Sequence, residues 1–263
     1  MLRFCANVSW LFREVPFLQR PEAARRAGFS GIEFHSAEGH TAAEVLRAAS
    51  AADVTVALFN AWPGDFLEGG PGLSGVPGRE AEFRLAVQRA CDFGAVVGGG
   101  AGVQIGQSRV PPGTSRDQCM QVYVENLRYA AAELAQAGCR VLVEPMNETD
   151  WPGVLVRDVS TALAAIAETG DPRIGLQFDT YHHCMAGEDV AAAVDELGGR
   201  IAHLQFSDAP GRHEPGTGNI EFDALFRALE RRKYPHWVAA EYRPSRPTLE
   251  TLAWLNTYRS NRP

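Results

Sequence analysis

The chain has 263 residues, a mass of 28.6 kDa, a formal net charge of −7 and a pI near 5.5. This acidic balance argues against nucleic acid as a partner, because a protein that binds phosphate backbones needs a basic surface. No run of about 18 apolar residues is present, so we expect no membrane span. The five cysteines include no C-x-x-C pair, which argues against a disulfide framework and favours a reducing cytoplasm.

Short apolar runs alternate with longer helical patterns along the chain. The predicted strands are Arg3–Ala6, Gly31–Phe34, Thr55–Phe59, Gly102–Ile105, Arg140–Glu144, Gly175–Asp179, Ile201–Phe206 and Val238–Tyr242. The predicted helices lie near residues 17–27, 41–52, 79–94, 115–137, 158–168, 188–197, 222–232 and 248–258. Short apolar strands of this kind are typical of parallel sheets that are covered on both faces.

Strand–helix units follow one another with no break in composition, and a closed α/β barrel of eight units is the simplest fold for them. We therefore predict a single (β/α)8 barrel, a TIM barrel, over residues 1–263, since such barrels run to about 250 residues as one domain. A doubly wound open sheet is the alternative, but Ala6–Ser9 is not the glycine fingerprint expected there. The long loop Ala61–Gly78 is expected to act as a lid over the barrel mouth.

Four consecutive predicted strands, the fifth to the eighth, each carry an oxygen-bearing side chain at the carboxyl end. These residues are Glu144, Asp179, Gln205 and Glu241, and this is the end of a barrel where active sites lie. A single acidic residue at a strand end is more often a helix cap or a salt-bridge partner. Their coincidence on four strands predicts one divalent metal site, and an all-oxygen set favours Mg²⁺ or Mn²⁺ over zinc.

Further polar side chains are expected near these four. His182, three residues after Asp179, is expected to bind a substrate hydroxyl or orient Glu144, with a merely packed histidine as the alternative. Arg212 is the candidate for a substrate carboxylate, because guanidinium groups bind carboxylates through two hydrogen bonds; the alternative is a solvated loop arginine. His203 points to the same face of its strand as Gln205, two residues later, and should lie one layer below it.

Segments in order along the whole chain carry a family pattern. They are Phe4–Phe12, Pro63–Asp65, Val76–Glu80, Glu125–Ala130, Glu144–Asn147, Asp179–His182, His203–Gln205, Glu214–Gly218 and Glu241–Tyr242. With these segments the chain resembles the hydroxypyruvate isomerase family of xylose isomerase-like barrels. A similar branch acts on 2-oxotetronate, and the motifs do not separate the two. The chain departs from the pattern at His35, and the small residues of Gly98–Gly102 are expected to widen the mouth.

The resemblance implies an isomerase that moves a carbonyl group between adjacent carbons of a small hydroxy-keto acid through an enediolate. The reaction would convert hydroxypyruvate to tartronate semialdehyde, or 2-oxotetronate to 3-oxotetronate. The resemblance makes Glu144, Asp179, Gln205 and Glu241 the ligands of one divalent metal, and Glu144 and Glu241 the acid–base pair. The expected partner is a small anionic keto acid, and the sequence leaves open whether the chain forms a homo-oligomer.

Three other functions remain open. A ketose 3-epimerase would share the scaffold and the metal ligands, and a pocket without a carboxylate-binding arginine would favour it. A metal nuclease, as among the endonuclease IV relatives, needs several histidine ligands and a basic face, whereas this chain has seven histidines and a charge of −7. A catalytically silent binding barrel is disfavoured because both glutamates are present.

Overall fold

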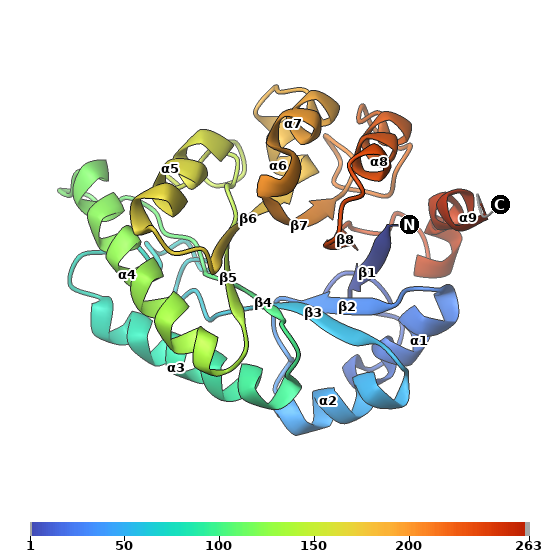
Figure 1. Ribbon diagram of the computed structural model, residues 1–263, viewed down its shortest axis with the longest axis horizontal. Helices are drawn as coiled ribbons and strands as arrows, with labels where there is room; N and C mark the ends of the chain where they lie inside the picture. The colour runs from blue at the N-terminus through green and yellow to red at the C-terminus, as the bar shows by residue number, and fades with distance from the viewer. Residues whose placement is uncertain (1, 261–263) are drawn as a thin grey trace.

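The computed structural model describes residues 2–260, in which eight parallel strands close a barrel (Figure 1). The strands are β1 Arg3–Asn7, β2 Gly31–Phe34, β3 Thr55–Asn60, β4 Gly102–Gln104, β5 Arg140–Val143, β6 Ile174–Asp179, β7 Ile201–Phe206 and β8 Trp237–Ala240. Each strand pairs with the next one in the sequence, and β8 pairs with β1 to close the barrel. The predicted (β/α)8 fold is confirmed.

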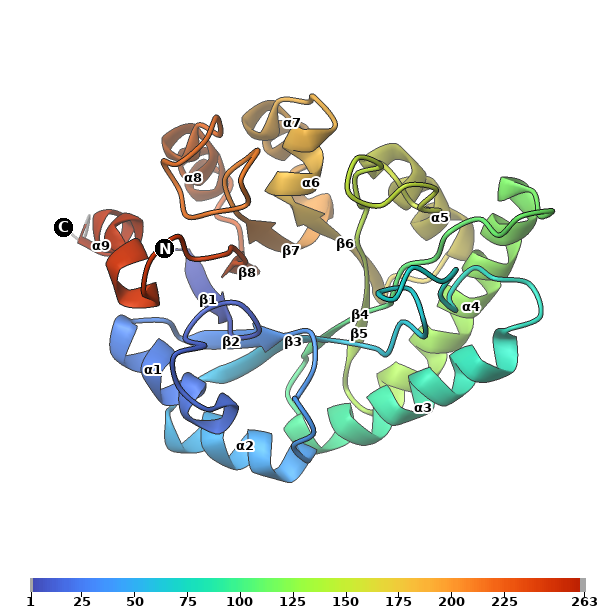
Figure 2. The ribbon, with the colours of Figure 1, turned by 180° about the vertical axis from the view of Figure 1, so that it is seen from behind.

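Helices surround this barrel (Figures 1 and 2). They are α1 Arg20–Ala27, α2 Ala42–Ala51, α3 Glu80–Val97, α4 Arg116–Gln136, α5 Val159–Thr169, α6 Thr180–Met185, α7 Val190–Leu197, α8 Phe222–Arg231 and α9 Ala253–Ser260, with 3-10 turns η1 Phe17–Gln19, η2 Gly198–Arg200 and η3 Thr248–Thr251. Helix α2 begins with a capping box, in which Thr41 and Glu44 exchange hydrogen bonds. Within residues 2–260, no helix combines the length and the apolar character that crossing a membrane requires.

The interior of the barrel differs from the core between strands and helices. Outside the strands, aromatic rings pack edge to face, as where Trp254 of α9 contacts Phe4 of β1 and Phe206 of β7. Inside the barrel lies a small apolar cluster of Cys5, Ala57 and Ala239. Toward the carboxyl ends the buried side chains are polar: Asn7, Glu33, Gln177, His203 and Gln205. This polar layer forms the floor of the candidate site.

The structure differs from the sequence-based expectations at several points near the mouth. Strands β5 and β8 stop at Val143 and Ala240, one and two residues earlier than predicted, so Glu144 and Glu241 are the first residues after them. The short helix α6 was not predicted; it begins because the Asp179 side chain caps the N–H of Tyr181. The predicted helix at 248–258 is divided into η3 and α9.

The structure places two segments, Gly98–Gly102 and Ala61–Gly78, that the sequence analysis expected near the barrel mouth. The run Gly98–Gly102 leads into β4 and so lies at the amino end of that strand, opposite the mouth. The expectation that it widens the mouth is therefore wrong, because parallel strands place all their amino ends on one side of the barrel. The loop Ala61–Gly78 does lie at the mouth, where its residues Pro63 and Phe66 line the cavity described below.

Candidate metal and substrate site

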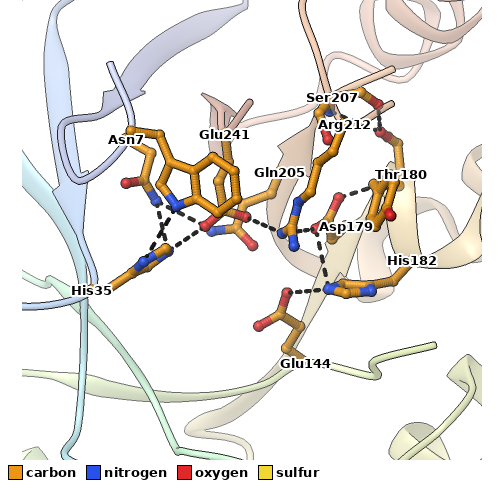
Figure 3. A network of polar contacts seen from close by, with 12 residues as sticks. Asn7, His35, Glu144, Asp179, Thr180, His182, Gln205, Ser207, Arg212 and Glu241 are labelled. Atoms are coloured by element: carbon orange, nitrogen blue, oxygen red, sulfur yellow. Dashed lines mark hydrogen bonds and ion pairs between the residues drawn. The ribbon is translucent and has the colours of Figure 1, made fainter. Parts of the chain in front are cut away.

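The four side chains that were predicted to be metal ligands converge at the carboxyl end of the barrel (Figure 3). Glu144, Asp179, Gln205 and Glu241 are each at most 7% exposed. Above them opens a cavity of about 300 Å³, lined by Glu144, Gln205 and Glu241 together with residues of the loop 61–78. A cavity of this size suits a small molecule.

Arg212 lies inside this cluster, between two of the carboxylates. Its Nη2 donates to Asp179 Oδ2 at 3.0 Å and to Glu241 Oε2 at 3.1 Å. Its Nε is buried and has no hydrogen-bond partner among residues 2–260. The residue adopts a φ of 55°, in the left-handed region that long side chains rarely occupy. Arg212 is therefore a held cation, 12% exposed, with a buried donor to spare, and not a solvated loop arginine.

A buried aspartate holds the loop that carries Arg212. Asp208 Oδ2 accepts hydrogen bonds from the backbone N–H groups of Gly216, Thr217 and Gly218 at 2.8–2.9 Å. Its Oδ1 accepts from Ala209 and Ile220. Because one carboxylate satisfies so many backbone donors, the loop 208–220 has a defined shape, and Arg212 is directed over the barrel.

Burial and charge separate the pKa values of the three carboxylates. Burial, with the charges of Glu241 and Asp179, raises the pKa of Glu144 well above its ordinary value. Burial raises the pKa of Asp179 to about 7, although the charge of Arg212 opposes it. Burial would also raise the pKa of Glu241, but the hydrogen bond from His35 and the charge of Arg212 outweigh it and lower the pKa to about 2. The cluster therefore has more carboxylate charge than its one guanidinium neutralises.

One ring nitrogen of His182, Nε2, faces the carboxylates of Glu144 and Asp179. Its Nδ1 accepts from the backbone N–H and the side-chain Nδ2 of Asn147, at 3.3 and 2.7 Å. Burial lowers the pKa of this histidine to about 3, so the ring is neutral and its proton lies on Nε2. Nε2 has no hydrogen-bond partner among residues 2–260 and lies 3.8 Å from Glu144 and 3.6 Å from Asp179. In this tautomer His182 is a hydrogen-bond donor and not a metal ligand.

The donor set fits a divalent cation. The carboxylates of Glu144 and Asp179 lie together with His182, with one polar atom of each within 4.8 Å of the others, and His182 contributes its N–H to this space and not a ligand atom. Arg212 Nη2 already provides positive charge between Asp179 and Glu241. Buried carboxylate and amide oxygens, with more carboxylate charge than one guanidinium neutralises, form a donor set that suits a hard cation such as Mg²⁺ or Mn²⁺.

A family model for xylose isomerase-like TIM barrels matches residues 21–258. The chain belongs to the xylose isomerase-like TIM barrel family. It is 37% identical over 258 residues to 2-oxo-tetronate isomerase of Cupriavidus necator, covering 98% of this chain and 99% of that protein. It is 36% identical over 259 residues to hydroxypyruvate isomerase of Escherichia coli, covering 98% of this chain and all of the relative. Such relatives are isomerases, and this member of the family is an enzyme of the same class.

Solved structures agree with this fold. A crystal structure named AP endonuclease, family 2, from Brucella melitensis superposes with a TM-score of 0.92 at 35% identity, covering 98% of this chain and 99% of that one. L-ribulose 3-epimerase superposes with a TM-score of 0.78 at 22% identity, covering 99% of this chain and 86% of that one. At that identity the epimerase supports only the shared barrel of the xylose isomerase-like family.

The first two strands of this xylose isomerase-like barrel supply site residues that the sequence analysis did not assign. Asn7 Nδ2, at the end of β1, donates to Glu241 Oε1 at 2.9 Å. His35 Nε2 lies 2.5 Å from the same oxygen, and Trp10 Nε1 donates to His35 Nδ1 at 3.4 Å. Asn7 and Glu33 are polar residues near the carboxyl ends of their strands. The criterion that identified Glu144 and Asp179, a polar side chain at a strand end, could therefore have identified them too. Nothing in the sequence pairs His35 with Glu241.

Proposed function

We propose that this enzyme moves a carbonyl group between adjacent carbons of a small, anionic hydroxy-keto acid, with hydroxypyruvate or 2-oxotetronate as substrate. The observation that supports this most directly is the meeting of Glu144 and Glu241, with different partners, at one small cavity (Figure 3). The names of the full-length relatives indicate the two candidate substrates.

The reaction needs a proton acceptor and a proton donor. One glutamate removes a proton from the carbon that bears the hydroxyl group, and the electron pair moves into an enediolate. The other glutamate delivers a proton to the former carbonyl carbon, while the hydroxyl proton passes to the new hydroxyl oxygen. Glu144 directly follows β5 and Glu241 directly follows β8, and these strands are three positions apart around the barrel. The two glutamates can therefore approach a substrate from different sides. The Nε2–H of His182 is available to a substrate oxygen.

We propose Glu144, Asp179, Gln205 and Glu241 as the ligands of one Mg²⁺ or Mn²⁺ ion. When bound, the cation would stabilise negative charge that develops on the substrate oxygens. Its charge would also balance the buried carboxylates, which supports its place in this cluster.

Arginines at the mouth support an anionic substrate. The unpartnered Nε of Arg212 can donate to a carboxylate in the cavity. Beside it, a wider cavity of about 890 Å³ is lined by Arg13, Arg243 and Arg246. Arg243 lines both cavities and stacks on Trp10, with its guanidinium carbon 4.8 Å from the ring centre. None of these three exposed arginines pairs with a carboxylate within residues 2–260, so their charge is available to an anion that approaches the mouth.

A ketose 3-epimerase is the alternative, because it would use the same kind of cluster. The arginines at the mouth favour a carboxylate-bearing substrate over a neutral sugar. A nuclease is disfavoured because the four proposed ligands include no histidine and the chain carries a net charge of −7.

The deciding experiment is a carbonyl-shift assay with hydroxypyruvate, 2-oxotetronate and a neutral ketose, before and after chelation and with Mg²⁺ or Mn²⁺ restored. We expect one of the two acids to be isomerised. Chelation should abolish turnover while the far-UV circular dichroism spectrum stays unchanged, because a barrel of this size folds on its own core. Turnover of the ketose alone would overturn the proposal in favour of the epimerase.

A further inference from the structure

Glu33 is a fully buried carboxylate that lies beneath the proposed metal position and has no assigned role. Its Oε1 accepts from Asn7 Nδ2 at 3.0 Å and from Gln205 Nε2 at 2.8 Å. Its Oε2 lies 2.6 Å from His203 Nε2 and 3.8 Å from Cys5 Sγ. Polar groups of four side chains thus surround both oxygens, two from β1 and two from β7.

Glu33 Oε1 accepts from the NH₂ groups of both neighbouring amides, Asn7 and Gln205, and these contacts fix the direction of the two amides. Gln205 must turn its NH₂ group down toward Glu33, which leaves its carbonyl oxygen facing away from that carboxylate. The oxygen accepts from Gln177 Nε2 at 2.6 Å and retains a second lone pair. A buried amide that was turned the other way would place two oxygens against each other.

The same carboxylate acts on Glu241 through Asn7. The Oδ1 of Asn7 accepts from the backbone N–H of Ser9, so its NH₂ group faces the barrel interior. That group donates one hydrogen to Glu33 and the other to Glu241. Of the four proposed ligands, Gln205 thus donates to Glu33 directly, and Glu241 accepts from Asn7, whose NH₂ group also donates to Glu33.

Cys5, Glu33 and His203 also lie close enough together to hold a metal themselves. Hydrogen bonds from Cys5 and His203 to Oε2, and from Asn7 and Gln205 to Oε1, already satisfy the Glu33 oxygens, which is the arrangement expected of a structural anchor. A carboxylate that orients a ligand from behind is a common feature of metal sites.

We propose that Glu33 is a positioning residue that makes Gln205 present its oxygen, and not its NH₂ group, to the proposed metal position, and that holds Asn7 as a donor to Glu241. The effect on metal binding rests on the function proposed above. The orientation of Gln205 by Glu33 does not, and it can be measured in metal-free protein.

The test is a double-mutant cycle of wild type, Glu33→Gln, Gln205→Glu and the double variant. In wild type, Gln205→Glu sets two carboxylates against each other at a contact of 2.8 Å, so the melting temperature of metal-free protein should fall by about 2 °C or more. In the Glu33→Gln background, Gln205→Glu places the new carboxylate next to the amide introduced at position 33, which can donate a hydrogen bond to it. There it should raise the melting temperature, because the two sites are coupled.

Mn²⁺ binding, measured by calorimetry on the same proteins, gives a second readout. Glu33→Gln should weaken it about tenfold or more, as expected when a partner of a ligand is lost. The control is Glu22→Gln, which removes one negative charge from the exposed surface of α1 and should leave Mn²⁺ affinity unchanged.

Two results would overturn the proposal. One is an equal shift in melting temperature for Gln205→Glu in both backgrounds, which would show that the sites are independent. The other is a folded Glu33→Gln variant that binds Mn²⁺ as tightly as wild type. If wild type itself binds no Mn²⁺, the proposed metal site fails, and the melting temperatures still decide whether Glu33 orients Gln205.

Discussion

The guanidinium of Arg212 is hydrogen-bonded to the carboxylate of Asp179, with Nη2 3.0 Å from Oδ2. The same nitrogen contacts Glu241 at 3.1 Å, so one side chain neutralises part of the charge between two proposed ligands. A divalent cation bound to these carboxylates would take over that role and release the guanidinium toward a substrate carboxylate. The loop arginine and the proposed metal position are therefore linked through the carboxylates that they share.

Replacement of Arg212 tests whether its guanidinium and a bound cation neutralise the same carboxylates. Arg212→Gln leaves Asp179 and Glu241 without their buried cation, and loss of one partner of a buried pair typically costs about 3–5 kcal/mol. Urea unfolding should show metal-free Arg212→Gln less stable than wild type, and Mg²⁺ should stabilise the variant more than it stabilises wild type. An equal effect of Mg²⁺ on both proteins would show that the guanidinium and the metal do not share these carboxylates.

The raised pKa of Asp179 predicts how the stability of metal-free protein depends on pH. In the unfolded chain this group ionises near its ordinary pKa of 3.8, whereas in the folded chain it holds its proton up to a pKa of about 7. At Asp179 the folded state therefore binds more protons between about pH 4 and 7, and the contribution of this group to stability falls as pH rises through this window. Glu144 shifts in the same direction, and the lowered pKa of Glu241 acts below the window. His182 opposes this fall below about pH 6.5, because burial lowers its pKa from 6.5 to about 3 and the unfolded chain binds the extra proton there.

Chemical unfolding of chelated protein at pH 5, 6, 7 and 8 measures this dependence. Asp179→Asn should have a shallower fall, because its side chain does not titrate. Saturating Mg²⁺ should remove most of the fall in wild type, since a bound cation favours the ionised carboxylate. The same dependence on pH in chelated wild type and chelated Asp179→Asn would contradict the raised pKa of Asp179.

The three unpaired arginines at the mouth predict that association depends on ionic strength. Arg243→Gln and Arg246→Gln should lower kcat/KM for an anionic substrate with little change in kcat, because these exposed side chains act before chemistry. The salt dependence of kcat/KM should become weaker in both variants. Arg47→Gln, a change of an exposed arginine on α2, is the matched control. An equal effect of that variant on kcat/KM would show that the arginines at the mouth have no special role in attracting the substrate.

Much of the fold could be predicted from the sequence, because the signals of a (β/α)8 barrel are local. Each strand is a short apolar run, and β2 and β7 have the predicted bounds. The ends of β5 and β8 were predicted one and two residues late, because the side chains of Glu144 and Glu241 follow apolar runs with no turn residue between. Helix α6 depends on the capping of Tyr181 by Asp179, which the pattern of apolar residues does not reveal.

The candidate site was predictable only in part, for a physical reason. Polar side chains at the carboxyl ends of consecutive strands must meet in a closed barrel. The four proposed ligands, three carboxylates and one amide, could therefore be named from the sequence. Contacts made by loops from distant parts of the chain carry no such signal. Arg212 reaches Asp179 because Asp208 shapes its loop, and His35 reaches Glu241 across 206 positions of the sequence.

Substitution of the two glutamates separates metal binding from proton transfer. Glu144→Gln and Glu241→Gln keep an oxygen but lose the group that accepts a proton, so activity at saturating metal should stay reduced by about 10²–10⁴-fold. Asp179→Asn also loses a charge from the cluster but no proposed proton carrier, and excess metal should rescue it further. Full recovery of all three variants at high metal would make the glutamates ligands only, and another residue would have to carry the proton.

The central claim is that a proton leaves one carbon of the substrate and that a different carboxylate delivers a proton to the next. The most direct test is to run the isomerisation in D₂O and follow the new C–H position of the product by NMR, with an enzyme-free control for spontaneous exchange. The account predicts that this position carries deuterium from solvent in each turnover. A product that retains the hydrogen of the substrate at that carbon would contradict it, because that result indicates direct transfer between the carbons or a single residue that carries the proton across.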